Sequence, residues 1–111
     1  MTELHTRRDY RTLQISTQLT GDTVLITATG EIDLDSAPKL AGALEIIDAS
    51  RDVVLDMSGV HFMDSTGLSV IIRQSMRKRE AGGSLLIRDP AAPVRRLLEF
   101  CCLDHFIEPR R

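Results

Sequence analysis

Short apolar runs that alternate with helical spacing constrain the fold of this 111-residue sequence more than any other feature. Residues 53–55 (Val-Val-Leu) and 84–87 (Ser-Leu-Leu-Ile) have the composition expected of strands that are buried on both faces. Between them, apolar side chains recur at helical spacing, in Leu68, Ile71, Ile72 and Met76. This spacing predicts a core-facing helix that begins near Ser65 and ends at the glycine pair 82–83. A crossover helix between two strands favours a parallel or mixed sheet.

The flanking segments supply the remaining elements. Side chains alternate between apolar and polar over residues 13–19 and again over residues 24–29, and Gly21-Asp22 lies between the two runs. This pattern predicts a β-hairpin whose strands are half-buried. Further helices are predicted to start at residues 35–38, which include a proline in the first turn, and at Asp89, whose side chain can cap a helix.

The predicted order of elements is β-β-α-β-α-β-α(-β), in which the optional last strand uses Phe106 and Ile107. We therefore expect one α/β domain over residues 12–111, with a mixed central sheet of four to five strands and helices packed against it. Residues 1–11 are polar and unpatterned, and are predicted to form a flexible N-terminal tail.

Composition and charge exclude several classes of function. The net charge of -2 and the 4% aromatic content give no general attraction for nucleic acid. No apolar run approaches the roughly 20 residues of a membrane span, and the N-terminus lacks the apolar stretch of a signal peptide. The two cysteines, Cys101 and Cys102, are adjacent, which favours reduced thiols that pack along the last helix. These features predict a cytoplasmic protein that binds neither membrane nor nucleic acid directly.

Residues 62–67, Phe-Met-Asp-Ser-Thr-Gly, hold the chemistry-bearing side chains of the predicted loop 57–64 and of the helix start that follows it. Asp64 or Ser65 can simply cap the helix. A hydrolase would use Ser65 as nucleophile and His61 as base, but Met63 stands where a nucleophile elbow has its first glycine.

Other ligand chemistries find less support. Phosphate-binding glycine loops are absent, so no cofactor is expected, and a metal site at Asp33, Asp56 and Asp64 rests on sequence spacing alone. A regulatory phosphoserine at Ser65 is the remaining reading, because a phosphate would add about -1.5 to -2 charges beside a helix N-terminus. Periodicity leaves these alternatives open.

Two stretches resemble the anti-sigma factor antagonist family, whose members have the STAS-domain fold. The first is Gly-Glu-Ile-Asp at residues 30–33, and the second runs from the Val-Leu-Asp strand at 54–56 into Asp-Ser-Thr-Gly-Leu at 64–68. The resemblance covers roughly residues 12 to 108. It implies a non-enzymatic partner-switching protein whose unphosphorylated form binds an anti-sigma factor and so releases a sigma factor.

The resemblance also implies specific roles for several residues. Ser65 would be phosphorylated by the anti-sigma factor, which is typically a serine kinase in this family, and a metal-dependent serine phosphatase would restore the active form. Asp33 matches the family's acidic residue on the kinase-facing surface, and Asp64 flanks the modified serine. The partner-binding surface is therefore expected to comprise Asp33, Asp64, Ser65, Thr66 and Gly67.

The sequence departs from the family pattern at one site residue. Thr66 stands where some members have a second serine, which leaves a neighbouring hydroxyl as an alternative acceptor of phosphate. An alternative function is that of a STAS scaffold or ligand-binding module in a stressosome-like complex, where Ser65 would not control binding. A homodimer is compatible with either function.

Overall fold

In the described part of the chain, four strands form one mixed sheet in the order in which they occur along the sequence. The computed structural model describes residues 11–109. The strands are β1 (Gln14–Thr20), β2 (Thr23–Ile32), β3 (Asp52–Met63) and β4 (Ser84–Arg88). β1 is antiparallel to β2, whereas β2, β3 and β4 are parallel to one another. The predicted hairpin and the predicted mixed sheet are thus confirmed.

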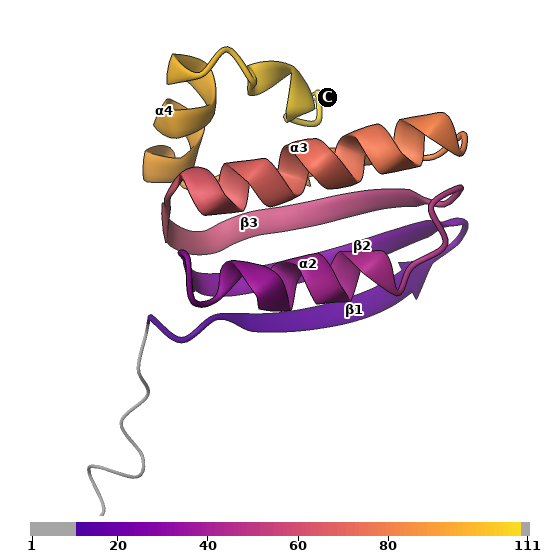
Figure 1. Cartoon of the computed structure of the whole chain (residues 1–111), viewed down its shortest axis with the longest axis horizontal. Helices are drawn as coiled ribbons and strands as arrows, with labels where there is room; N and C mark the ends of the chain where they lie inside the picture. The colour runs from indigo at the N-terminus through magenta and orange to yellow at the C-terminus, as the bar shows by residue number, and fades with distance from the viewer. Residues whose placement is uncertain (1–10, 110–111) are drawn as a thin grey trace, which may run out of the picture.

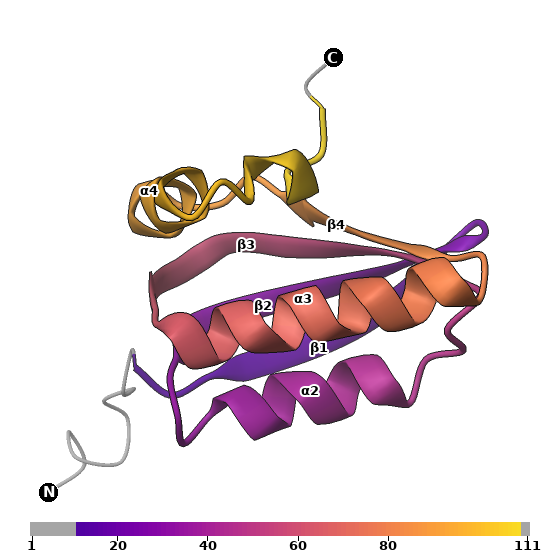
Figure 2. The ribbon, with the colours of Figure 1, turned by 45° about the horizontal axis from the view of Figure 1, so that its top comes forward.

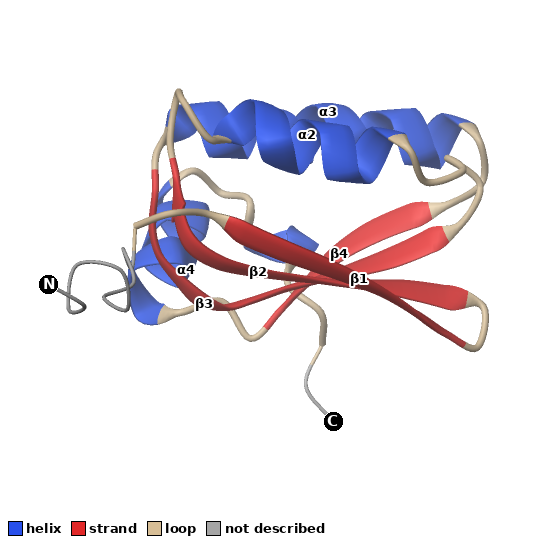
Figure 3. Ribbon diagram, turned by 90° about the horizontal axis from the view of Figure 1, so that it is seen from below, coloured by secondary structure: helices blue, strands red, loops and turns tan. Residues whose placement is uncertain are grey.

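Within residues 11–109, three α-helices and one 3₁₀-helix accompany the sheet: α2 (Ala37–Glu45), α3 (Ser65–Glu80), α4 (Ala92–Phe100) and η1 (Asp104–Phe106). The connections β2-α2-β3 and β3-α3-β4 each join neighbouring parallel strands, and right-handed crossovers in one direction put both helices on the same face of the sheet. Figures 1 and 3 show α2 over β1 and β2, and α3 beside it. α4 lies on the other side of β3 (Figure 2).

The core lies between the sheet and the helices α2 and α3. Ile26, Leu40, Leu55 and Ile71 are fully buried there, and Leu68 is 7% exposed. Met76, which was predicted to be in the core, is 54% exposed, so that prediction is wrong. A residue eight positions along a helix lies about 80° round from the first, whereas position i+7 returns to the same face, and the buried residue there is Ser75.

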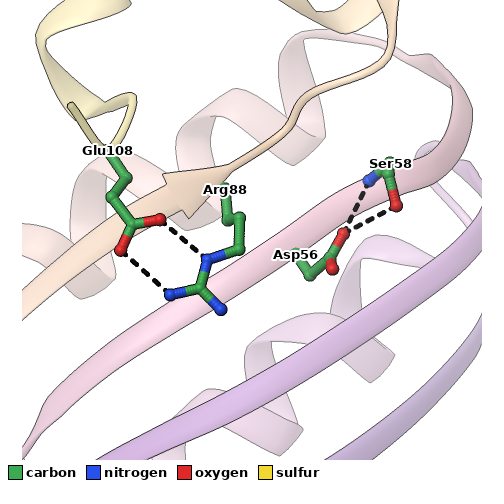
Figure 4. A network of polar contacts seen from close by, with 4 residues as sticks. All are labelled: Asp56, Ser58, Arg88 and Glu108. Carbon is green, nitrogen blue, oxygen red and sulfur yellow. Dashed lines mark hydrogen bonds and ion pairs between the residues drawn. The ribbon is translucent and has the colours of Figure 1, made fainter. Parts of the chain in front are cut away.

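β3 extends further than predicted, through residues expected to form the loop 57–64. Two shifts in its register with β2 each add one residue to β3, between Asp56 and Gly59 and between Val60 and Phe62. Such bulges break the alternation of buried and exposed side chains, which made this half of the strand look irregular in the sequence. At the first bulge, Asp56 accepts hydrogen bonds from the backbone N–H and the hydroxyl of Ser58, at 2.9 and 2.8 Å (Figure 4).

The C-terminal segment corrects three predictions. Asp89 does not cap α4, because its φ is 49° and the N-cap residue is Ala91. The predicted last strand is instead the helix η1 followed by a single bridge from Ile107 to Ile87. Cys101 and Cys102 are free and exposed after the end of α4, so neither packs in the core.

The end of the described chain is attached to β4 by an ion pair. The guanidinium of Arg88 donates to both carboxylate oxygens of Glu108, at 2.7 and 3.1 Å (Figure 4). The predicted tail, residues 1–11, lies outside the described residues except for Arg11. The backbone carbonyl of Arg11 accepts a hydrogen bond from the N–H of Glu31.

Candidate functional site

The predicted site residues meet at one end of the sheet, where β2 and β3 both finish. The N–H of Asp64 donates to the carbonyl of Ile32 at 3.1 Å, so the residues after the two strands are held side by side. α3 begins at the same place, with Ser65 as its first residue. Asp33 and the segment 64–67 are therefore brought together at this end of the molecule.

Asp64 caps α3, as one of the sequence alternatives proposed. Its backbone is extended, with φ -104° and ψ -171°, and its side chain accepts a hydrogen bond from the N–H of Thr66 at 2.9 Å. The same carboxylate oxygen accepts from the hydroxyl of Thr66. One side chain thus satisfies an otherwise unpaired N–H of the first turn and also holds the Thr66 hydroxyl.

Ser65 and Thr66 carry adjacent hydroxyls in different situations. Ser65 is exposed, and its hydroxyl makes no hydrogen bond to any residue within 11–109. Thr66 is half-buried, and its hydroxyl is bonded to Asp64. Of the two, only the Ser65 hydroxyl stands open to solvent and to an incoming protein.

Gly67 is buried beneath the start of α3. A Cβ atom on this residue would lie 2.5 Å from Cγ of Met63 and 2.8 Å from Cγ2 of Ile32. Absence of a side chain therefore lets the helix approach the ends of β2 and β3 closely. Gly67 is itself buried, so it lies beneath the surface on which Ser65 is exposed.

Asp33 organises the connection between β2 and α2. One of its carboxylate oxygens accepts from the N–H of Ser36 at 3.0 Å and from the N–H of Asp35 at 3.1 Å. The Ser36 hydroxyl lies 3.0 Å from the same oxygen. The hydrogen bonds from the Ser36 N–H and hydroxyl lower the pKa of Asp33, because they favour the charged form. The carboxylate is thus fixed in place at the rim of the site.

The backbone conformation at position 30 explains why the 30–33 motif begins with glycine. Gly30 has a φ of 108°, and a Cβ there would lie 2.4 Å from the carbonyl oxygen of Thr12. A side chain would be strained by the backbone angle and would also collide with the backbone of the segment that precedes β1. The absence of a side chain at Gly30 therefore lets the segment before β1 lie close to β2, three residues before Asp33.

The described residues do not form the arrangements that were proposed for catalysis or for metal binding. Nε2 of His61 lies 3.4 Å from the carboxylate of Glu31, and no hydrogen bond joins His61 to Ser65 in the described part of the chain. The Asp56 carboxylate accepts its hydrogen bonds from Ser58 at the bulge. Among residues 11–109, no cluster of three or more histidine, cysteine, aspartate or glutamate side chains is suited to hold a metal ion.

An apolar groove of about 760 Å³ adjoins the site, and sequence reasoning missed it. It runs between the end of β3 and α4, and its lining residues are Phe62, Met63, Pro93, Arg96, Leu97, Glu99 and Phe100. Phe62 is 44% exposed and Phe100 is 88% exposed, unusually high values for phenylalanine. The sequence signal was available, because Phe62 lies inside the motif that contains Ser65.

Comparison with known proteins places this fold and site in a family. Residues 15–108 match the family model described as "Mlab, STAS domain". The anti-sigma-B factor antagonist of Listeria monocytogenes is 35% identical over 89 residues, which are 78% of each chain. The architecture and the sequence together define an α/β module of the STAS type. The chain belongs to the anti-sigma factor antagonist family of STAS domains.

Solved structures agree on the fold. The anti-sigma factor antagonist SpoIIAA in its unphosphorylated form superposes with a TM-score of 0.74 at 18% identity, covering 90% of this chain and 89% of that one. The Bacillus SpoIIAA structure in the phosphorylated form gives a TM-score of 0.67 at 17% identity, covering 90% of this chain and 92% of that one. In the described residues, no helix has the length and apolar character needed to span a membrane.

Proposed function

We propose that this chain acts as an anti-sigma factor antagonist by switching partners, without catalysing a reaction itself. Its unphosphorylated form binds an anti-sigma factor that has serine kinase activity, and a sigma factor is thereby released. Phosphorylation of Ser65 ends the binding, and a serine phosphatase restores it. The observation that carries the proposal is the exposed Ser65 hydroxyl at the first position of α3, which makes no hydrogen bond to any of the described residues.

The hydrogen bonds around Ser65 favour it over Thr66 as the acceptor of phosphate. A kinase needs a hydroxyl that can enter its active site, and the Thr66 hydroxyl would have to give up its bond to Asp64 first. Moving Thr66 would also disturb the cap of α3, because the N–H of the same residue bonds to the same carboxylate. Modification of Ser65 requires no such rearrangement.

A phosphate on Ser65 would change the surface without unfolding the domain. It would add about -1.5 to -2 charges to a neutral hydroxyl that follows Asp64 at the start of α3. The helix N-terminus favours the new anion, whereas the Asp64 carboxylate repels it. A partner that fits the neutral surface would meet a solvated double charge, which is costly to bury.

The support from relatives comes from the class of protein to which they belong and from the phosphorylation states in which they have been solved. The Listeria monocytogenes relative is an anti-sigma-B factor antagonist, and SpoIIAA has been solved in both unphosphorylated and phosphorylated forms. A phosphorylation switch in this chain is consistent with both. Asp33, at the rim of the same site, is proposed to form part of the surface that the kinase contacts.

The proposal is tested with the anti-sigma factor kinase encoded in the same genome. The wild type, Ser65→Ala and Thr66→Val are incubated with the kinase and ATP, phosphate is located by mass spectrometry, and affinity is measured before and after the reaction. We expect phosphate on Ser65 in the wild type and in Thr66→Val, none in Ser65→Ala, and at least a tenfold loss of affinity on phosphorylation.

Two results would contradict the proposal. Phosphate found on Thr66 instead of Ser65 would show that the proposal names the wrong acceptor. Unchanged affinity after complete phosphorylation of Ser65 would support instead a STAS scaffold whose binding this residue does not control.

A further inference from the structure

β1 forms an open edge of the sheet in the described part of the chain. It is first in the strand order, and only β2 pairs with it. Its sequence, Gln-Ile-Ser-Thr-Gln-Leu-Thr, contains no charge and no proline, and every residue from Ser16 to Thr20 is exposed. Natural edge strands usually carry charges, prolines or bulges that prevent pairing with another chain, and β1 has none of these.

The register of the hairpin shows which backbone groups face the edge. Thr20 and Thr23 flank the two-residue turn at Gly21 and Asp22, so they form the closing hydrogen-bonded pair. Residues of an antiparallel pair alternate between bonding inward and pointing outward. The even-numbered residues of β1 therefore bond to β2. The N–H and C=O groups of Ile15, Thr17 and Leu19 point away from the sheet.

The side chains of β1 are arranged symmetrically about Thr17. If two copies of the strand pair antiparallel with Thr17 opposite itself, Ile15 lies opposite Leu19 and Ser16 lies opposite Gln18. Apolar residues thus meet apolar residues and polar residues meet polar ones. Each pair formed by residues 15, 17 and 19 can exchange two N–H···O bonds across the interface.

The helix above this edge also presents an unpartnered apolar residue. Nζ of Lys39 donates to the carbonyl of Leu13 at 2.7 Å, so this side of α2 faces β1. Ile46 lies seven positions later, on the same side of the helix, and is 85% exposed. Seven residues of helix advance about 10 Å, as do about three residues of strand, which places Ile46 level with Ser16 and Thr17.

Ile15 and Leu19 lie on the same face of the sheet as α2. They pair with Ala28 and Val24, which are buried beneath the helices, and Leu19 is 60% exposed. A two-fold axis through Thr17, perpendicular to the sheet, would keep both α2 helices on one face. It would bring Leu19 and Ile46 of each copy into a shared apolar layer with Ile15 of the other.

We propose that two copies of this chain associate through β1, antiparallel and centred on Thr17, to form a continuous sheet across a two-fold axis. The occupant of the edge is a second copy because the strand is self-complementary under that symmetry and carries no charge to repel itself. The proposal does not depend on the phosphorylation of Ser65.

The test measures the mass of the full-length chain by sedimentation over a range of concentrations, for the wild type, Thr17→Lys, Thr17→Glu and an equimolar mixture of the two variants. We expect the wild type to dimerise with increasing concentration and each variant alone to stay monomeric, because its like charges face each other on the axis. The mixture should dimerise again, since opposite charges then meet. Ala81→Lys adds the same charge at the exposed end of α3 and should dimerise like the wild type.

Thr17→Pro provides an independent check on the backbone. The N–H of Thr17 points outward, so proline should leave the bonds to β2 intact while blocking the pairing of two copies. Thermal melting at low concentration shows whether each variant is folded. A wild type that stays monomeric at all concentrations would overturn the proposal. Charged or proline variants at Thr17 that dimerise like the wild type would also overturn it. The same holds if β1 pairs only with a strand of another protein.

Discussion

Asp64 accepts hydrogen bonds from both the N–H and the hydroxyl of Thr66, and it accepts none from the hydroxyl of Ser65, which lies between the two residues in the sequence. Ser65 is left with a hydroxyl that bonds to nothing within residues 11–109. A cap and a candidate phosphorylation site thus share one turn of α3. The structural interpretation of this motif applies to Asp64 and the regulatory one to Ser65, so the two are compatible.

The cap should have a measurable effect on stability. Asp64→Ala removes the acceptor for the Thr66 N–H and is expected to lower the free energy of unfolding by about 1 kcal/mol. Asp64→Asn keeps a side-chain oxygen and should lose much less. Urea denaturation of the three proteins checks this, and equal losses for alanine and asparagine would show that charge rather than the cap is responsible.

Gly67 and Gly42 make a matched pair of helix glycines. Gly67→Ala should destabilise the domain by about 1–3 kcal/mol, because its Cβ would press on Met63 and Ile32. A Cβ on Gly42 in α2 meets nothing within 4 Å, so Gly42→Ala should stabilise by up to about 1 kcal/mol through helix propensity. Thermal melts with opposite shifts are expected. A stabilised Gly67→Ala would show that the helix start is less tightly packed.

The stability of the domain should depend on the ionisation of Asp33. Its pKa is lowered from the ordinary 3.8, first by the Ser36 N–H and then by the Ser36 hydroxyl. A lowered pKa in the folded state means that the carboxylate stabilises the fold above the unfolded pKa, and that this contribution is lost as the pH falls through the folded pKa. The difference in unfolding free energy between wild type and Asp33→Asn should be constant above about pH 5 and should shrink as the pH falls through the folded pKa, which lies below 3.8. A difference independent of pH would contradict this.

The groove beside Ser65 should contribute to partner binding if the proposed function is correct. Phe100 is 88% exposed, so Phe100→Ser should leave the melting temperature unchanged and weaken binding of the anti-sigma factor about tenfold or more. Ile46→Ser removes a similarly exposed apolar side chain from the C-cap of α2, and is expected to leave this affinity unchanged. Calorimetric titration of both variants checks the prediction. Equal affinities would place the partner surface away from the groove.

Local sequence patterns predicted the order of elements and the start of α3 at Ser65, because strand alternation, helix periodicity and capping depend on nearby residues. They failed where tertiary contacts decide. Residues 57–63 looked like a loop because β3 carries two extra residues relative to β2, and only the pairing shows them as bulges. Met76 matched the helical spacing, but packing on the sheet selected Ser75 for the inner face.

The candidate site divides in the same way. The sequence by itself determined that a serine follows an aspartate at a helix N-terminus, and its likeness to a known family predicted that this serine is phosphorylated. Only the tertiary structure decided that Asp64 holds the hydroxyl of Thr66 and leaves that of Ser65 open. It also brought Phe62 and Phe100, which are 38 positions apart in the sequence, into the lining of one groove. Hydrogen-bond geometry and contacts between distant segments exist only once the chain has folded, so a linear pattern does not contain them.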